Sequence, residues 1–370
     1  MNEDVMKRVI IVGGGYAGAN LARALDSRAE VCLVEAREHF VHNVAAIRSV
    51  VDPSLLAKIV IPYDRLLRRG RVRQGIVASA FDGGVMLADG ATIEGDIVIV
   101  ATGSHYARPF KPTLHGARAF EDGVKAAHAS LLATDRVTIV GAGAVGVELA
   151  GEISTAHPRK RVTLVSGAST LMPGYSAKLA RSLEAQLRAK GVAIHLSTRV
   201  ESLDATDSPY LGTLPGMPYA AENQLIFPAL GARPITAIFR HMPAAYFDAQ
   251  GRVRVDAWLR PAGAQRLFAL GDAAATGDPM TIVAITRQVP WLAKIIAATL
   301  AGESPKSLPA YVPWSSRGIL VPLGPRDGAS MLPLMRDGVL VGNWTTALIK
   351  GRELFIPRYR KEFGYARKCA

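Results

Sequence analysis

Cysteine is scarce in this sequence, since Cys32 and Cys369 are the only two among 370 residues. No pair has CxxC or CxxxxC spacing, which argues against a redox-active disulfide and against a metal site built from thiolates. Cys32 lies in the apolar run 31–34, where a free cysteine behaves as a small buried hydrophobic residue. We therefore expect no metal, a reducing compartment and a cytoplasmic protein.

Acidic residues are also under-represented: 31 Asp and Glu face 44 Lys and Arg, a formal net charge of +13. This balance suits nucleic acid, an anionic membrane or phosphate-rich cofactors as partners. Aromatic residues make up only 6% and no nucleic-acid-binding motif occurs, so a base-stacking surface is not supported. Much of the excess charge lies near the C-terminus, in Lys350, Arg352, Arg358, Arg360, Lys361, Arg367 and Lys368. Such a local excess favours a docking surface.

Uninterrupted apolar runs of membrane-spanning length are missing as well. The most apolar stretch, 280–300, carries Arg287, Pro290 and Lys294, which suits a membrane span poorly. Near the N-terminus, three glycines break the run that a signal peptide would need. N-myristoylation requires glycine directly after the initiator methionine, where this sequence has Asn2. We expect no signal peptide, no transmembrane segment and no such lipid anchor.

The length favours two or three domains, and a strand–glycine–helix unit opens the chain. The β-branched run 9–12 predicts a strand buried on both faces. Gly13, Gly15 and Gly18 follow at GxGxxG spacing, and then a helix and a second strand lead to Glu35. The glycines allow a tight turn, close approach of a pyrophosphate and helix packing, and Glu35 can bind a ribose diol. The complete unit predicts a dinucleotide site, whereas the glycines alone would be an ordinary turn.

The same unit recurs from residue 137. A β-branched run is followed by Gly141, Gly143 and Gly146, a helix and another strand. The position that matches the acid of the first unit falls near Ser166, which carries no charge. A carboxylate there would repel the 2′-phosphate of NADPH, so its absence leaves NADH and NADPH both open. Two such units indicate two bound dinucleotides.

Two shorter motifs support this interpretation. The apolar run that begins at Asp96 ends in Ala101, Thr102 and Gly103, and the run that begins at Leu267 ends in Gly271-Asp272. Small residues at the end of a buried strand let the backbone press against a cofactor, and a helix N-terminus after the acid would point at it. Each motif alone could equally be a buried strand with a capping Asp.

The motifs GGGYAG, ATGS, GAGAVG and ALGDA, in this order, resemble the two-dinucleotide flavoprotein reductases, which include type II NADH dehydrogenases. A narrower resemblance is to the ferroptosis suppressor proteins, the apoptosis-inducing-factor-like NAD(P)H–quinone oxidoreductases. It is carried by the segments 41–48, 73–75, 146–148, 324–328 and 350–355. The resemblance extends from about Val9 to about Arg360, nearly the whole chain.

The resemblance implies FAD and NAD(P)H as cofactors and a quinone as electron acceptor. It places FAD on Gly13, Gly15, Gly18, Glu35, Arg48, Val77, Ala101, Thr102, Gly103 and Asp272. It places the nicotinamide dinucleotide on Gly141, Gly143, Gly146 and Glu148. It puts His42, Lys350 and Phe355 near the flavin ring and the quinone, where a cation stabilises reduced flavin and an aromatic ring stacks. From the residues alone, His42 would be a packing or capping histidine and Phe355 a core aromatic.

The sequence departs from the family at three points. The family's N-terminal lipid-anchor glycine is missing. Pro228 falls in what should be a central strand, from which it removes a hydrogen-bond donor. The segment 208–221 holds three prolines with little alternation, so we expect a loop where the family has a hairpin. Nicotinamide binding is therefore less secure than FAD binding.

The expected fold is α/β, with two Rossmann-like dinucleotide-binding domains and a C-terminal α+β domain. The FAD domain is discontinuous, 1–113 with 232–300, and the NAD(P) domain, 114–231, is inserted into it. Residues 301–370 form the C-terminal domain, which covers the flavin and acceptor site and contains strands at 321–328 and 339–344. Because its basic end is interleaved with aromatics, it could dock on anionic membrane; the alternative is a solvated basic tail.

The expected mechanism is ping-pong, with hydride passing from NAD(P)H to flavin and two electrons then passing to an acceptor. Without a reactive cysteine pair, that acceptor should be a quinone or another small planar molecule, not a disulfide. Two alternatives stay open: a small-molecule oxidoreductase with a non-quinone acceptor, and a non-enzymatic basic flavoprotein that binds nucleic acid or a partner. The oligomeric state is not predicted.

Overall fold

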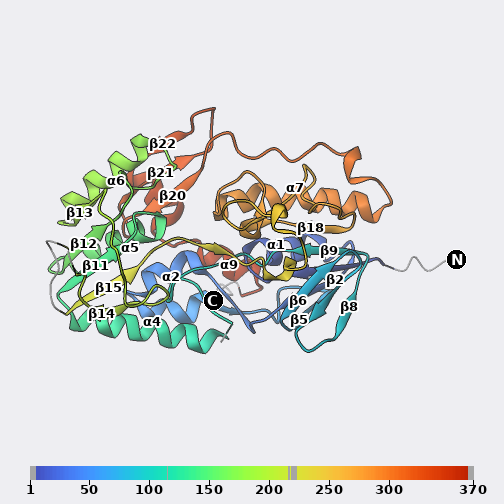
Figure 1. Cartoon of the computed structure of the whole chain (residues 1–370), viewed down its shortest axis with the longest axis horizontal. Coiled ribbons are helices and arrows are strands. Elements are labelled where there is room, and N and C mark those ends of the chain that lie inside the picture. The colour runs from blue at the N-terminus through green and yellow to red at the C-terminus, as the bar shows by residue number, and fades with distance from the viewer. Residues whose placement is uncertain (1–5, 115, 216, 218–222, 366–370) are drawn as a thin grey trace, which may run out of the picture.

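The computed structural model describes residues 6–114, 116–215, 217 and 223–365. Two parallel sheets form two lobes that lie side by side (Figure 1). The first sheet is built, in spatial order, from β18 (Leu267–Ala269), β9 (Ile97–Val100), β1 (Arg8–Val12), β2 (Glu30–Glu35) and β5 (Arg71–Gln74). All its strands are parallel.

Both faces of this sheet are covered, which is why the run 9–12 is apolar throughout. On one face Val9 and Ile11 pack with α1 (Tyr16–Leu25) and α7 (Ile282–Leu300). On the other face Ile10 and Val12 pack with a second small sheet of β6 (Val77–Phe81), β7 (Gly84–Leu87) and β8 (Thr92–Glu94). Successive residues of β1 therefore alternate between two hydrophobic cores, one on each face of the sheet.

The second sheet has the order β13 (Ala193–His195), β12 (Arg161–Val165), β11 (Arg136–Val140), β15 (Gln224–Pro228) and β14 (Tyr210–Gly212). Its helices are α4 (Gly116–Ala133), α5 (Ala144–Ala156) and α6 (Ala177–Ala189). The two lobes confirm the expected class of two Rossmann-like units with a further C-terminal part.

One expectation for the second sheet is confirmed and one is wrong. Pro228 does belong to a strand that lies between two others, β15, but as the last residue of that strand it pairs with Val140 of β11 and does not disrupt β15. The antiparallel neighbour β14 does not extend to Pro228, and hydrogen bonding resumes at Ala229, whose N–H donates to the Val140 oxygen at 2.8 Å. The segment expected to be a loop contains β14, so a short hairpin-like pair is present after all; residues 216 and 218–222 lie outside the described residues.

The chain leaves the first lobe for the second and returns to it at the same place. β10 (Ser104–His105) and β16 (Arg233–Pro234) form an antiparallel pair there. This pair lies close to the expected boundaries at 113/114 and 231/232. The smaller elements are β3 (His39–Val41), β4 (Val60–Pro62), α2 (Asn43–Ser49), α3 (Leu56–Ile59), β17 (Val253–Arg254) and β19 (Ala274–Ala275).

The C-terminal part begins with β20 (Ile319–Pro322), β21 (Gly328–Leu332) and β22 (Val339–Val341). This sheet packs on α5 and α6 of the second lobe (Figure 1). After this sheet α8 (Asn343–Thr346), which packs on β20 and β21, leads into a π-helical turn (Ala347–Gly351), and α9 (Ile356–Glu362) then packs on α3. The C-terminal part therefore contacts both lobes: its sheet packs on the second lobe, and α9 packs on α3.

The aromatic residues near the C-terminus are not an exposed interfacial surface. Tyr359 is 2% exposed and Phe363 is 1% exposed, and both pack on Phe40 in the core of the first lobe. The expectation that aromatic rings mix with cations at a membrane surface is therefore wrong for Tyr359 and Phe363, whereas Phe355 and Tyr365 are half-buried. The cations Arg358 and Lys361 are exposed, whereas Arg367, Lys368 and Cys369 lie outside the described residues.

By length and composition, α7 could cross a membrane, with a mean hydropathy of 1.2 over its most apolar window, and no other helix in the described part could. It packs along α1 in the first core. Its buried Gln288 accepts a hydrogen bond from the Gly271 N–H at 2.9 Å and donates to Asp278 at 3.0 Å. These contacts are those of a core helix.

Candidate functional site

A cavity of about 400 Å³ lies at the carboxyl ends of β1, β2 and β9; we call it the first glycine cavity. Among the residues that line it are Gly13, Gly15, Glu35, Val77, Ala101, Thr102, Gly103 and Asp272. The expected FAD positions are thus brought together, with two exceptions: Gly18 packs against the turn, and Arg48 lies elsewhere.

The three glycines of this turn are required for different reasons. Gly13 has φ +100°, and a Cβ there would lie 2.6 Å from the Ala101 oxygen. A Cβ on Gly18 would lie 1.8 Å from the Gly13 oxygen, so α1 could not approach β1. A Cβ on Gly15 would meet nothing within 4 Å. The protein itself does not need glycine at position 15, and the absent side chain leaves the backbone there open to close approach by a ligand.

Glu35 is 4% exposed at the end of β2. Its carboxylate accepts from the Gly14 N–H at 2.5 Å and forms an ion pair with Arg37 at 2.8 Å. Burial raises the pKa of Glu35, but the Arg37 guanidinium and these hydrogen bonds outweigh burial and leave the pKa below its ordinary value. The carboxylate is therefore ionised and accepts hydrogen bonds, as a ribose diol requires.

The second glycine cavity, of about 820 Å³, repeats this design at β11 and β12. A Cβ on Gly141 would lie 2.2 Å from the Ala229 oxygen, and one on Gly146 would lie 2.0 Å from the Gly141 oxygen. A Cβ on Gly143 would again meet nothing within 4 Å. Gly141 and Gly143 line the cavity, and Gly146 packs behind it.

A junction cavity of about 200 Å³ lies between the two glycine cavities. Lys111 and Asp272 line all three cavities, so the two dinucleotide sites meet where these side chains lie. The Lys111 Nζ is 2.6 Å from the Ser104 Oγ and 3.3 Å from the Asp272 Oδ2. Ser104 donates to the same oxygen of Asp272 at 2.6 Å.

Glu148 and Lys350 line the junction cavity as a buried ion pair. The Lys350 Nζ is 2.7 Å from the Glu148 Oε1 and 2.9 Å from the Leu320 oxygen. Burial raises the pKa of Glu148 above its ordinary value, although the Lys350 cation opposes this rise. The pair joins α5 of the second lobe to the π-helical turn, a type of turn that often marks functional sites.

His42 is fully buried and lines none of the described cavities. Its Nε2 donates to the Leu354 oxygen at 2.5 Å, and its Nδ1 accepts from the Tyr16 hydroxyl at 2.9 Å. Burial lowers the pKa of His42 to about 4; the Leu354 hydrogen bond opposes this shift and the Lys350 cation adds to it. The histidine is neutral and supports the site from behind.

Phe355 lines the junction cavity in a conformation that side chains seldom adopt. Leu354 has φ +50° and Phe355 has φ +60°, two consecutive residues in the left-handed region. The His42 hydrogen bond to the Leu354 oxygen holds this turn. Non-glycine residues persist in such conformations where surrounding contacts fix them, commonly at functional sites.

Arg48 lies apart from both glycine cavities. Its guanidinium forms an ion pair with Glu152 of α5 at 2.8 Å, and its Nη1 donates to the Arg352 oxygen at 3.4 Å. The side chain thus ties α2 to the second lobe and the C-terminal part. The resemblance placed Arg48 on FAD; the geometry gives it a structural contact.

Three residues at the junction were missed from the sequence: Tyr16, Asn43 and Lys111. The Asn43 Oδ1 is buried and has no hydrogen-bond partner among the described residues, so it is an acceptor available to a ligand. Asn43 follows His42 in a segment that carried the family resemblance, which was the available signal. No sequence signal pointed to Lys111, because the segment after β10 contains no motif that would distinguish this lysine from others.

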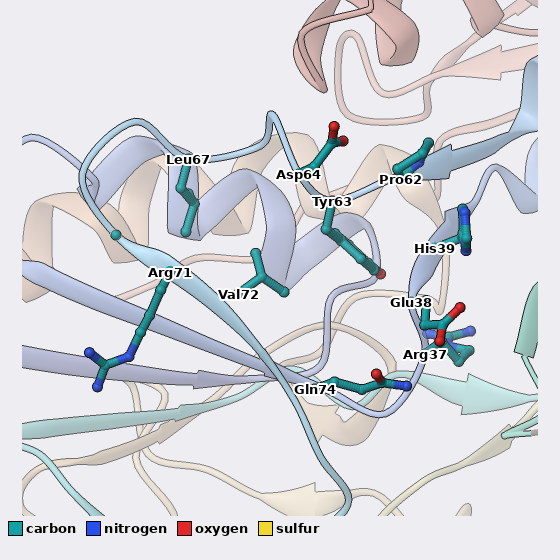
Figure 2. A pocket seen from close by; sticks show the side chains of 11 residues that line it. Arg37, Glu38, His39, Pro62, Tyr63, Asp64, Leu67, Arg71, Val72 and Gln74 are labelled. Carbon is teal, nitrogen blue, oxygen red and sulfur yellow. The ribbon is translucent and has the colours of Figure 1, made fainter.

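A further cavity of about 470 Å³ lies behind the first glycine turn, and Figure 2 shows its lining. Tyr63 reaches from the segment after β4 toward the stretch that carries Arg37 (Figure 2). Its hydroxyl donates to the Gly14 oxygen at 2.9 Å, and a Cβ on Gly14 would lie 2.6 Å from that hydroxyl. Tyr63 in the wall of this cavity therefore supports the glycine turn, and the cavity shares no lining residue with the junction cavity.

Residues 7–289 match the family described as "Pyridine nucleotide-disulphide oxidoreductase", and the chain belongs to this family. It is a flavoprotein reductase with FAD and NAD(P)H as its cofactors. The disulphide in the family's name has no counterpart in the described residues, where Cys32 is the one cysteine and is buried.

Two groups of curated relatives are similar to almost the whole chain. "Apoptosis-inducing factor homolog B" of Dictyostelium discoideum is 29% identical, over 95% of this chain and 96% of the relative. "Ferroptosis suppressor protein 1" of Homo sapiens is 28% identical, over 94% of this chain and 93% of the relative. These relatives confirm the resemblance expected from the motifs.

Solved structures support the fold over the full length. The sulfide:quinone oxidoreductase from Aquifex aeolicus matches with a TM-score of 0.73 at 15% identity, over 97% of this chain and 92% of that chain. NDH2 from Plasmodium falciparum in complex with NADH matches with a TM-score of 0.69 at 13% identity, over 97% of both chains. At these identities the likeness concerns the fold alone.

Proposed function

We propose that this protein is an FAD-dependent NAD(P)H:quinone oxidoreductase. When bound, FAD accepts a hydride from the nicotinamide and passes two electrons to the second substrate. The first glycine cavity holds FAD through Gly13, Gly15, Glu35 and Asp272, and the second cavity holds the donor through Gly141 and Gly143. The discontinuous FAD domain, 1–113 with 232–300, supplies most of the first cavity, and the inserted NAD(P) domain, 114–231, supplies most of the second, which Lys111 and Asp272 of the FAD domain also line.

The observation that carries this proposal is the meeting of three cavities at Lys111 and Asp272. Hydride transfer requires the reacting atoms of two cofactors to approach within van der Waals contact. Two dinucleotide cavities that lay apart would keep the reacting atoms out of contact, whereas cavities that share Lys111 and Asp272 allow the atoms to meet.

The junction cavity has the lining that a planar, mostly apolar acceptor needs. Its walls include Val44, Ile47, Ile282 and Ile319, and Phe355 offers a ring for stacking. The polar groups are few: the Lys350 ammonium favours electron density that develops on a bound quinone oxygen, and the Asn43 oxygen accepts a hydrogen bond from the hydroquinone product, since the quinone itself has no donor. The Aquifex sulfide:quinone oxidoreductase, whose name includes a quinone, fits this assignment.

An acceptor series tests the assignment. With NADPH as donor, we expect turnover with short-chain benzoquinones or naphthoquinones to exceed turnover with non-quinone dyes at equal driving force. Phe355→Leu and Phe355→Ala should raise KM for the quinone while the first step, flavin reduction by NADPH, keeps its rate. Thr286→Ala, exposed on α7 and outside the cavities, is the matched control.

Equal loss of both half-reactions in the cavity variants would show that the junction cavity is not an acceptor site. Rapid turnover with non-quinone acceptors alone would favour a small-molecule oxidoreductase of another class. The protein acts, in this proposal, in the cytoplasm and in peripheral contact with anionic membrane, through exposed cations such as Arg358 and Lys361.

A further inference from the structure

The outer end of the second glycine cavity contains one cation, Arg199. Ser166 and Gly167 follow β12 directly and line the cavity there, together with Thr198 and Arg199. Two backbone hydrogen bonds join the segments: the Thr198 N–H donates to the Ser166 oxygen at 2.9 Å, and the Ser197 N–H donates to the Ala168 oxygen at 2.8 Å. Arg199 is therefore fixed next to Ser166 although it lies 33 residues away in the sequence.

Ser166 is the structural equivalent of Glu35. In the first unit the Gly13 N–H donates to the Val34 oxygen at 2.8 Å, one residue before Glu35. In the second unit the Gly141 N–H donates to the Val165 oxygen at 2.8 Å, one residue before Ser166. The two units therefore superpose in register at the place where an acid binds the ribose hydroxyls of a dinucleotide.

The charge at this place is opposite in the two units. In the first unit Glu35 neutralises the neighbouring Arg37 at 2.8 Å. In the second unit no acid stands at the equivalent position, and no salt bridge to Arg199 forms within the described part of the chain. Arg199 is exposed, so its guanidinium can turn toward an anion at the ribose.

The adjoining groups are suited to an anion. The Ser166 Oγ accepts from the Ala168 N–H at 3.2 Å, which leaves its own proton free to donate. Gly167 adds no side chain, and a Cβ there would lie 3.9 Å from the Cα and Cβ of Arg199. Glu201 lines the same wall and opposes this charge, but its carboxylate is not paired with Arg199 in the described structure.

We propose that Arg199, with the Ser166 hydroxyl, binds the 2′-phosphate of NADPH and makes NADPH the preferred electron donor. This specificity site rests on the proposed function, which places the nicotinamide dinucleotide in the second glycine cavity. An arginine forms paired, charge-assisted hydrogen bonds with a phosphate, and NADH offers only a hydroxyl at that position.

The test compares two mononucleotides that lack the nicotinamide, 2′,5′-ADP and 5′-AMP, by calorimetry on the FAD-loaded protein at low salt. We expect 2′,5′-ADP to bind about tenfold or more tightly than 5′-AMP, and this advantage to shrink as salt is added. Arg199→Ala should remove the advantage and leave 5′-AMP affinity unchanged, while Arg199→Lys should retain part of it. Glu201→Gln should increase it.

Arg181 is exposed on α6 and lies outside the cavity, so Arg181→Ala removes one positive charge without touching the site. This variant controls for the long-range effect of net charge. The inference is overturned if wild-type protein binds NADH yet shows no preference for 2′,5′-ADP, or if Arg199→Ala weakens both mononucleotides equally. In either case the proposed function stands. Failure to bind NADH, NADPH and both mononucleotides would overturn the proposed function together with this inference.

Discussion

Replacement of Gly15 by alanine separates the needs of the ligand from those of the fold. Gly15 precedes α1 with φ −69° and ψ −168°, a conformation that alanine adopts without strain. Its added Cβ would meet no protein atom within 4 Å. We therefore expect the free energy of unfolding of the FAD-free protein to change by less than about 1 kcal/mol, with a small gain from the restricted unfolded chain.

The same methyl group should be severe for FAD. It occupies the space through which a pyrophosphate reaches the backbone N–H groups, so we expect an affinity loss of at least about 100-fold, which corresponds to about 2.7 kcal/mol. At a fixed FAD concentration, the stabilisation of the folded state by FAD should fall by the same amount. Gly18→Ala is the contrasting variant, because its Cβ would lie 1.8 Å from the Gly13 oxygen, and it should lower stability by more than about 3 kcal/mol even without FAD.

The assay is a pair of thermal melts, with and without FAD, together with the flavin absorbance of the purified proteins. Gly15→Ala should have the melting temperature of the FAD-free wild type, and added FAD should not raise it. The purified variant should be colourless. A yellow Gly15→Ala protein whose FAD affinity is within about threefold of wild type would refute the assignment of this turn to the pyrophosphate.

Further expectations concern the buried charges. Lys350→Met leaves Glu148 buried without its cation, and should lower the free energy of unfolding by about 3 kcal/mol near pH 8 in denaturant melts. Because burial raises the pKa of Glu148, the loss should be smaller near pH 5, where protonation removes the charge; an equal loss at both pH values would contradict this. Burial lowers the pKa of His42 to about 4, so stability from this group is present above its ordinary pKa of 6.5 and is lost as the pH falls toward 4. Wild type should lose about 2 kcal/mol from this source between about pH 7.5 and about pH 5, and His42→Gln should lack that part of the loss. Tyr311→Phe removes a donor to the buried Asp278 and should destabilise by about 1–2 kcal/mol in the same melts, whereas no change would mean that Asp278 is satisfied without it.

The two glycine units could be predicted from the sequence because their geometry is local. Strand, turn and helix follow one another within about thirty residues, and each glycine answers a constraint set by its immediate neighbours. The structure adds that Gly15 and Gly143, unlike Gly13 and Gly18, are free of protein contacts at the Cβ position. That distinction depends on packing and could not be obtained from spacing.

The junction could be predicted only in part and only by resemblance, since it is assembled from segments far apart in the chain. The resemblance indicated Lys350 and Phe355, whereas no local spacing marks Lys111 and Asn43 as their partners. Pro228 was placed in a central strand as the structure has it, but the sequence did not show that it stands at the strand end, where the neighbouring strand has already stopped and no donor is needed. His42 and Arg48 were placed by resemblance, and the contacts give both of them structural roles behind the cavities.

The central claim is that electrons pass from NAD(P)H through FAD to a quinone at the junction of the three cavities. The most direct measurement mixes FAD-loaded protein with a small excess of NADPH under anaerobic conditions and follows the flavin absorbance before and after a water-soluble quinone is added. The account predicts bleaching of the flavin by NADPH, followed by full return of colour once the quinone added equals the NADPH added, because any remaining NADPH reduces the flavin again. Absence of bleaching with both NADPH and NADH, or bleached protein that a quinone does not recolour, would contradict it.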